Sequence, residues 1–173
     1  MDETKRLTFL VNDMLDLSML EAGSAKLNKV KYNLTDSLQQ TINRISSLVQ
    51  NESYQLVFEY EDAVNVVADE VKLTQAFYNL LLNAITYSWD DKRVIVRQII
   101  KENTVKIEVI DHGEGIKQND LPYIWERYYK VDKQHKRPLM GTGFGLAIVR
   151  KVIEMHGGKY GVEFAEGKGS TFW

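Results

Sequence analysis

Two asparagines with the spacing to act together, Asn79 and Asn83, lie one helical turn apart within residues 69–88. At about 100° per residue they fall on one narrow arc of a predicted helix. The other polar residues on this arc are Lys72, Gln75 and Thr86. Nearly all remaining residues between 73 and 87 are apolar or aromatic, so we predict that the helix is buried. Its two carboxamides therefore face either a network within the protein or a ligand.

A second motif, at residues 111–116, follows a predicted strand and contains Asp111, Gly113, Gly115 and Ile116. A carboxylate at the end of a strand can accept a hydrogen bond from an exocyclic amine. Glycines allow the backbone to approach a flat ring closely. Turns rich in Asp and Gly are common, so this motif alone does not identify a nucleotide site.

A third motif, at residues 141–147, places Gly141, Gly143 and Gly145 at the start of a predicted helix. The free N–H groups and the positive end of a helix suit a phosphate. The dinucleotide-binding fingerprint is excluded because residues 136–140 do not form a strand and too few residues remain for a βαβ unit. The P-loop pattern occurs nowhere in the sequence.

An aromatic run at residues 124–130 lies between the two glycine motifs. We interpret Trp125 and Tyr128 as core anchors and Lys130 as a candidate phosphate contact. None of the three histidines has the spacing of a metal ligand, so we interpret them as surface or capping residues.

The composition of the 173 residues is that of a soluble globular domain with an appendage. The net charge of -2 gives no reason to expect nucleic acid as a partner. The absence of cysteine excludes disulfides, thiolate catalysis and Cys-based zinc sites. The sequence has no signal peptide and no apolar run long enough to cross a bilayer.

The elements that must position these motifs can be read from hydrophobic periodicity and turn residues. Residues 2–22 form an amphipathic helix of the kind found in helical bundles, which ends at Gly23. A helix capped by Thr35 or Asp36, which runs to about residue 50, follows a short strand. The predicted strands cover residues 29–34, 54–60, 63–67, 93–101, 104–110, 159–165 and 170 onward. A last helix is predicted over residues 142–155. This order predicts an α+β fold, a two-layer α/β sandwich whose mixed, mostly antiparallel sheet is covered on one face by helices.

In this order the motifs resemble those of the ATP-binding catalytic domain of sensor histidine kinases, within the Bergerat-fold ATPase superfamily. Residues 79–87 resemble its Asn motif, 111–116 the first Gly motif, 124–130 the Phe motif and 141–146 the second Gly motif. Residues 167–172 resemble the closing Gly-Ser/Thr element. Residues 1–24 resemble the second helix of a dimerisation domain, which leaves 25–173 as the catalytic domain.

The resemblance implies a two-component kinase domain that binds ATP with Mg²⁺. It would transfer the γ-phosphoryl group to a histidine on a dimerisation domain missing from this chain. Asp111 would bind the adenine amino group, Tyr87 would pack against the base, and Asn83 would hold the metal. Asn79 and Lys130 would be the catalytic residues. The full set of implied ATP contacts is Asn79, Asn83, Tyr87, Asp111, Gly113, Gly115, Ile116, Tyr129, Lys130, Gly141, Thr142, Gly143, Phe144, Gly145, Leu146 and Thr171.

The resemblance also implies partners: the dimerisation helices of the full-length kinase, a response regulator and a second copy in a homodimer. Residues 131–141 would form a mobile lid, and the domain would lie on the cytoplasmic side of a membrane-bound sensor. No nucleic acid is expected. The phosphoacceptor motif, a His followed by Glu and later Pro, is absent, so we expect no self-labelling.

Three alternatives stay open at this point. Thr86 stands where the family often has Lys or Arg, which keeps a nucleotide-binding pseudo-kinase possible. An anti-sigma-type serine kinase is opposed by the bundle-like N-terminal helix. A chaperone- or topoisomerase-type ATPase module is disfavoured by the aromatic motif at residues 124–130.

Overall fold

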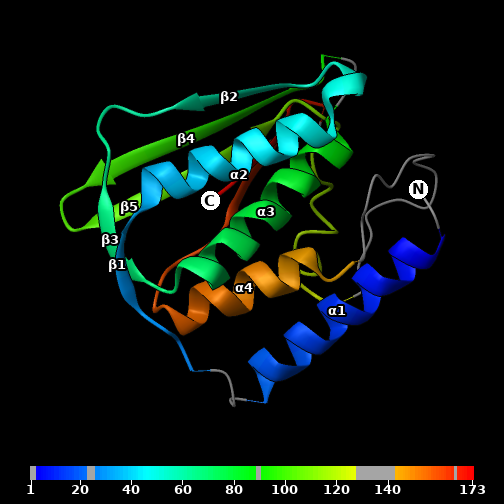
Figure 1. The fold of residues 1–173 in the computed structure, drawn as a ribbon. Helices are drawn as coiled ribbons and strands as arrows, with labels where there is room; N and C mark the ends of the chain where they lie inside the picture. The colour runs from blue at the N-terminus through cyan, green and yellow to red at the C-terminus, as the bar shows by residue number, and fades with distance from the viewer. Residues whose placement is uncertain (1–2, 23–25, 89–90, 128–142, 166) are drawn as a thin grey trace.

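The computed structural model describes residues 3–22, 26–88, 91–127, 143–165 and 167–173. Helices α2, α3 and α4 lie side by side against one face of a sheet, and α1 lies along α4 (Figure 1). The elements are α1 (Glu3–Glu21), β1 (Val30–Asn33), α2 (Leu34–Leu48), a 3₁₀ turn (Gln50–Glu52), β2 (Gln55–Glu59), β3 (Asn65–Ala68), α3 (Glu70–Tyr87), β4 (Arg93–Lys101), β5 (Thr104–Asp111), α4 (Gly145–Met155), β6 (Val162–Ala165) and β7 (Gly169–Phe172). The predicted α+β fold is confirmed.

The main sheet contains five strands in the order β2-β4-β5-β7-β6. Strands β2 and β4 are parallel, and every other neighbouring pair in this sheet is antiparallel. The strands predicted at residues 93–101 and 104–110 form a hairpin, because β4 and β5 pair from Val94 opposite Asp111 to Lys101 opposite Thr104. The sheet is therefore mixed and mostly antiparallel, as predicted.

Strands β2 and β3 are neighbours in sequence but belong to different sheets, since β3 pairs with β1 in a separate antiparallel ribbon. The hydroxyl of Thr35 accepts a hydrogen bond from Val64 N at 3.0 Å and donates to Gln98 Oε1 at 2.9 Å. Gln98 Nε2 in turn donates to the carbonyl of Asp62 at 2.9 Å. These bonds hold residues 62–64 at the start of α2, so β3 continues beside β1.

The predicted cap of α2 is wrong. Asn33, rather than Thr35 or Asp36, precedes the first helical residue, and its side chain accepts from Asp36 N at 3.1 Å. Thr35 is buried and already bonded to Gln98. The start of α3 has the same kind of cap, because Asp69 Oδ1 accepts from Lys72 N at 3.1 Å.

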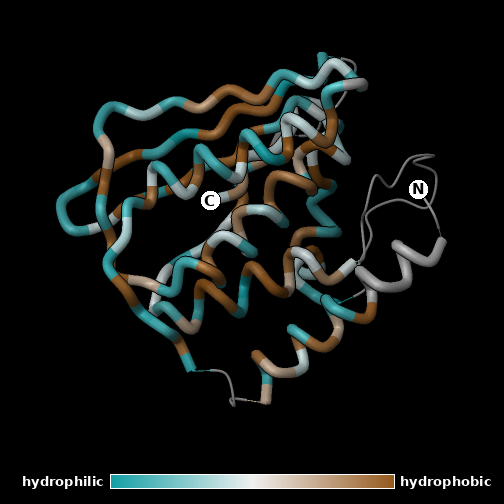
Figure 2. Tube along the Cα trace, viewed as in Figure 1, coloured by the Kyte–Doolittle hydropathy of each residue, from teal (hydrophilic) through white to brown (hydrophobic). Residues whose placement is uncertain are grey.

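Helix α3 is buried, as its apolar pattern predicts. Its buried residues are Ala76, Phe77, Leu80, Leu81, Ala84 and Ile85. Val94, Val96 and Val109 of β4 and β5 are fully buried on the face of the sheet that carries the helices. Figure 2 shows hydrophobic segments along α3, α4 and the strands behind them. The helix that carries the two asparagines is therefore fixed from several sides, which suits a site that needs exact positioning.

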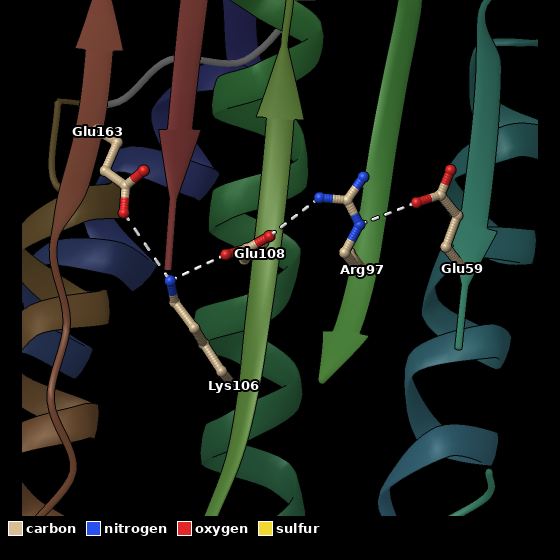
Figure 3. A network of polar contacts seen from close by, with 5 residues as sticks. All are labelled: Glu59, Arg97, Lys106, Glu108 and Glu163. Atoms are coloured by element: carbon tan, nitrogen blue, oxygen red, sulfur yellow. Dashed lines mark hydrogen bonds and ion pairs between the residues drawn. The ribbon is translucent and has the colours of Figure 1, made fainter. Parts of the chain in front are cut away.

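The opposite face of the sheet carries a chain of alternating charges (Figure 3). Arg97 contacts Glu59 at 2.9 Å and Glu108 at 3.4 Å, and Lys106 contacts Glu108 at 2.8 Å and Glu163 at 3.9 Å. These side chains are partly exposed, so each pair contributes about 1 kcal/mol or less. The network keeps this face polar and leaves the helix-covered face as the place for a site.

Helix α1 is attached to the rest of the molecule by its C-terminal half. Leu17 and Leu20 are buried, Gln75 Nε2 donates to Asp16 Oδ2 at 2.8 Å, and Arg127 pairs with Glu21. Among the side chains of residues 11–21 in α1, the apolar ones that stay more than half exposed are Val11, Met14, Leu15 and Met19. In the described parts of the chain, no helix is long and apolar enough to cross a membrane.

Candidate functional site

The polar stripe of α3 faces the start of α4. A Cβ built on Gly145 would lie 3.6 Å from Cβ and Cγ of Asn79, so the backbone of Gly145 rests against this side chain. The Nδ2 atom of Asn79 is buried and has no hydrogen-bond partner among the described residues. A buried donor without a partner carries a desolvation cost of about 1–3 kcal/mol, which an acceptor on a ligand would remove. The structure thus brings the asparagine motif and the second glycine motif together.

One turn further along the stripe, Asn83 is half-buried. Thr86 follows it, and its hydroxyl donates to the carbonyl of Leu82 at 2.7 Å. Thr86 therefore bonds back into its own helix and offers no positive charge to a phosphate.

The first turn of α4 is open to an anion. Phe144 precedes the helix and is buried, and no side chain within the described residues caps the helix. Gly143 just before it has φ of 82°, a conformation that favours glycine. Because the first N–H groups of a helix have no partner inside it, the start of α4 can bind an anion such as a phosphate. Leu146 lies half-buried in this first turn.

The carboxylate of Asp111 lies near the C-terminal end of α3. Asp111 is the last residue of β5, is only 2% exposed, and accepts a hydrogen bond from Gly113 N at 2.9 Å. A Cβ at Gly113 would overlap the carbonyl oxygen of Tyr87, so the loop packs directly on the C-terminal end of α3. Tyr87 itself is half-buried, and burial raises the pKa of its hydroxyl. Asp111 and Tyr87 are thus neighbours, as the resemblance implies.

Burial is the main cause that raises the pKa of Asp111 to about 6. The N–H groups of Gly113 and Ser170 and the nearby His112 oppose this shift, and Asp91 adds to it. A carboxyl in this environment is ionised at neutral pH but is ready to take up a proton in mild acid.

Strand β7 places Ser170, not Thr171, beside this carboxylate. Ser170 is the register partner of Asp111, whereas Thr171 lies opposite Ile110. Side chains alternate between the two faces of a strand, so Thr171 points away from the helix-covered face. Ser170 and Phe172 are both buried, which agrees with this alternation. Ser170 was not among the predicted contacts, although its position two residues before the apolar Phe172 indicates that both side chains face the helix-covered side of the sheet.

A family model described as histidine kinase-, DNA gyrase B- and HSP90-like ATPase matches residues 68–173. The chain belongs to this ATPase family. The sensor protein kinase WalK of Staphylococcus saprophyticus is 34% identical over 174 residues, which cover 99% of this chain and 28% of WalK. The chain thus spans less than a third of the length of that relative.

Two solved structures agree with this family assignment. Full-length ShkA in complex with AMPPNP is 26% identical to this ATPase domain, with a TM-score of 0.83 over 96% of this chain and 35% of ShkA. The catalytic domain of the histidine kinase ThkA is 24% identical, with a TM-score of 0.73 over 84% of this chain and 92% of that domain, and shows the fold alone. The ATPase domain therefore has the fold of histidine kinase catalytic domains.

Several predicted contacts of the ATPase domain lie outside the described residues, namely Tyr129, Lys130, Gly141, Thr142 and the predicted lid at 131–141. The first glycine motif is described to its end: Gly115 has φ of 74°, and Ile116 is buried. The segment before residue 128 is anchored by Trp125, whose ring centroid lies 4.7 Å from that of Tyr160 and 5.9 Å from that of Phe172. Trp125 is therefore a core anchor, as predicted.

Proposed function

We propose that this chain is the nucleotide-binding catalytic part of a sensor histidine kinase, which binds ATP with Mg²⁺ and transfers its γ-phosphoryl group to a histidine on a dimerisation domain. The observation that carries the proposal is the amide of Asn79, which has no partner within the described residues and lies beside Gly145 at the start of α4, where none of these residues caps the helix. An amide donor, free N–H groups and a positive helix end together suit a polyphosphate.

We place the adenine base at the C-terminal end of α3. Its amino group would donate to the carboxylate of Asp111, and the hydroxyl of Ser170 lies on the same face of the sheet next to this carboxylate. The base would lie close to the backbone of Gly113 and pack against Tyr87. An amine donor of this kind separates adenine from guanine, which has a carbonyl acceptor at the corresponding position.

The residues of α3 fit a bound Mg²⁺. The carboxamide oxygen of the half-buried Asn83 would hold the ion together with phosphate oxygens and water, as suits a hard ion with few protein ligands. The described residues contain no cluster of three or more His, Cys, Asp or Glu side chains that could bind a metal by themselves. The ion neutralises the charge of the phosphates during transfer. Asn79 would orient the same phosphates, with Lys130 as a further contact.

The partners follow from the same proposal. The acceptor histidine would be supplied by the dimerisation helices, and a response regulator would then receive the phosphoryl group. The exposed apolar side chains of α1, such as Met14 and Met19, support a place for this helix in a bundle with a second copy. The domain would act on the cytoplasmic side of a membrane-bound sensor.

A phosphotransfer assay tests the proposal. We expect the chain alone to bind γ-labelled ATP without becoming labelled, because its sequence has no phosphoacceptor motif. Addition of a dimerisation domain that carries the acceptor histidine should produce acid-labile label on that domain. Acid-labile label on any of the three histidines of this chain would contradict the expectation.

A pseudo-kinase is the second candidate, and the hydroxyl of Thr86, which bonds back to Leu82, is the observation that favours it. Nucleotide binding without transfer to the supplied domain would establish this candidate.

We expect Asn83→Ala to weaken Mg-ATP binding by about tenfold, the equivalent of one hydrogen bond to a charged group. Metal-free nucleotide should bind nearly as before, because the variant loses only the metal ligand. Calorimetric titration with and without Mg²⁺ measures both affinities. Asn43→Ala on the exposed side of α2 is the control for loss of a helical asparagine. If Asn83→Ala instead lowers the melting temperature and leaves the magnesium dependence intact, Asn83 serves the fold and not the metal.

A further inference from the structure

A charged pair beside the adenine end of the site has no role in the contacts proposed above. His112 Nδ1, in the loop after β5, lies 3.0 Å from Asp91 Oδ2, just before β4. The Nδ1 atom is buried and has no aligned hydrogen-bond partner within the described residues, so its contact with Asp91 becomes an ion pair only when the ring is protonated. The pair ties the segment that follows α3 to the loop that carries Asp111.

Contacts with the neighbouring backbone hold both residues in place. Asp91 Oδ1 also accepts from Arg93 N at 3.3 Å, which fixes the carboxylate at the start of β4. His112 lies between Asp111 and Gly113, and Gly113 packs against the Tyr87 carbonyl. A change in this pair therefore acts on the backbone that sets the direction of the Asp111 carboxylate.

We propose that His112 and Asp91 are positioning residues that hold the Asp111 carboxylate toward the base and set, through their opposite charges, how nucleotide binding depends on pH. The inference rests on the proposed function, because it takes Asp111 as the adenine acceptor. Neither residue needs to touch the nucleotide.

The charges around Asp111 give the sign of each effect. When protonated, His112 lowers the pKa of Asp111, and Asp91 raises it, while the N–H groups of Gly113 and Ser170 also stabilise the ionised form. Removal of the His112 charge should therefore raise the pH at which Asp111 takes up a proton. Removal of the Asp91 charge should lower that pH. A purely structural role for the pair would weaken binding in both variants without moving the two profiles in opposite directions.

The experiment is a calorimetric titration with Mg-ADP between pH 5 and 8 on the wild type, His112→Gln, Asp91→Asn and the double variant. The midpoint of the loss of affinity should move to higher pH in His112→Gln and to lower pH in Asp91→Asn, by about half a pH unit each. The double variant should return close to the wild-type midpoint. The phosphates of the nucleotide titrate in the same way for every variant, so their contribution cancels in the comparison.

Asp111→Asn separates a failure of this inference from a failure of the proposed function. Equal binding of Mg-ADP by the wild type and Asp111→Asn would overturn the adenine assignment itself. If Asp111→Asn loses affinity but the midpoints of the two single variants coincide or move in the same direction, only the role of His112 and Asp91 is overturned. Thermal melts at each pH verify that every variant is folded during the titration.

Discussion

Replacement of Gly113 by alanine should destabilise the fold by about 3 kcal/mol or more and remove nucleotide binding. A Cβ at this position would overlap the Tyr87 carbonyl oxygen and lie 2.9 Å from its carbon and 3.0 Å from Asp111 Oδ1. Overpacking that flexible side chains can relieve costs about 1–3 kcal/mol. Here the obstacle is the backbone at the end of α3, so either the helix end or the Asp111 loop must move.

Thermal and urea unfolding of Gly113→Ala measure the effect. Gly145→Ala is the matched control, because its new Cβ would make ordinary contacts of 3.6 Å with Asn79 and alanine favours a helix. We expect the control to melt at or above the wild-type temperature. If Gly113→Ala has the same melting temperature as Gly145→Ala, the loop does not pack on α3 as described.

The helix from Glu70 to Tyr87 was predictable because a nearly continuous apolar surface with a capping Asp69 admits few other structures. The hairpin of β4 and β5 was predictable for the same kind of reason, since alternation and a short polar turn fix its pairing locally. Local pattern was sufficient where the partner of an element is its neighbour in sequence.

The pairing of β3 and the cap of α2, which local patterns did not reveal, depend on distant partners. Alternation alone could not show that β2 and β3 join different sheets, because the bond from Val64 to Thr35 and the contact of Thr35 with Gln98 decide it. The same buried bond removes Thr35 as a cap of α2 and leaves that role to Asn33. Three residues with good capping side chains lie within four positions, namely Asn33, Thr35 and Asp36, so the local sequence gave no basis for the choice.

The candidate site was predictable as a set of motifs but not as a geometry. The burial of the Asn79 amide and its contact with Gly145 depend on how α3 and α4 pack, which no local pattern encodes. The place of Ser170 depends on the register of β7 against β5. The pair of His112 and Asp91 joins two loops whose proximity follows only from the folded sheet.

Asp111→Asn should weaken binding of ATP and ADP by about 1.5–3 kcal/mol, roughly 10- to 150-fold, the scale for a hydrogen bond to a charged group. The same change should not destabilise the protein without nucleotide. The pKa of Asp111 is raised from its ordinary value to about 6, so the ionised carboxyl opposes folding. The stability that the protonated carboxyl of Asp111 contributes is complete below about pH 4 and is lost as the pH rises through 6.

At pH 7.5 the wild type therefore carries a cost on the order of 3 kcal/mol, from a shift of about two pKa units. Asparagine has no charge to desolvate, but its amide nitrogen cannot accept from Gly113 or Ser170, which offsets part of the gain. We expect Asp111→Asn to melt at or above the wild-type temperature at pH 7.5, and this advantage should shrink toward pH 5 as the wild-type carboxyl becomes protonated. Calorimetry with Mg-ADP and melts at both pH values measure the two effects on the same protein. Unchanged affinity in the folded variant would remove Asp111 as the adenine anchor, and a variant that melts earlier at pH 7.5 would show that the carboxylate stabilises the fold instead.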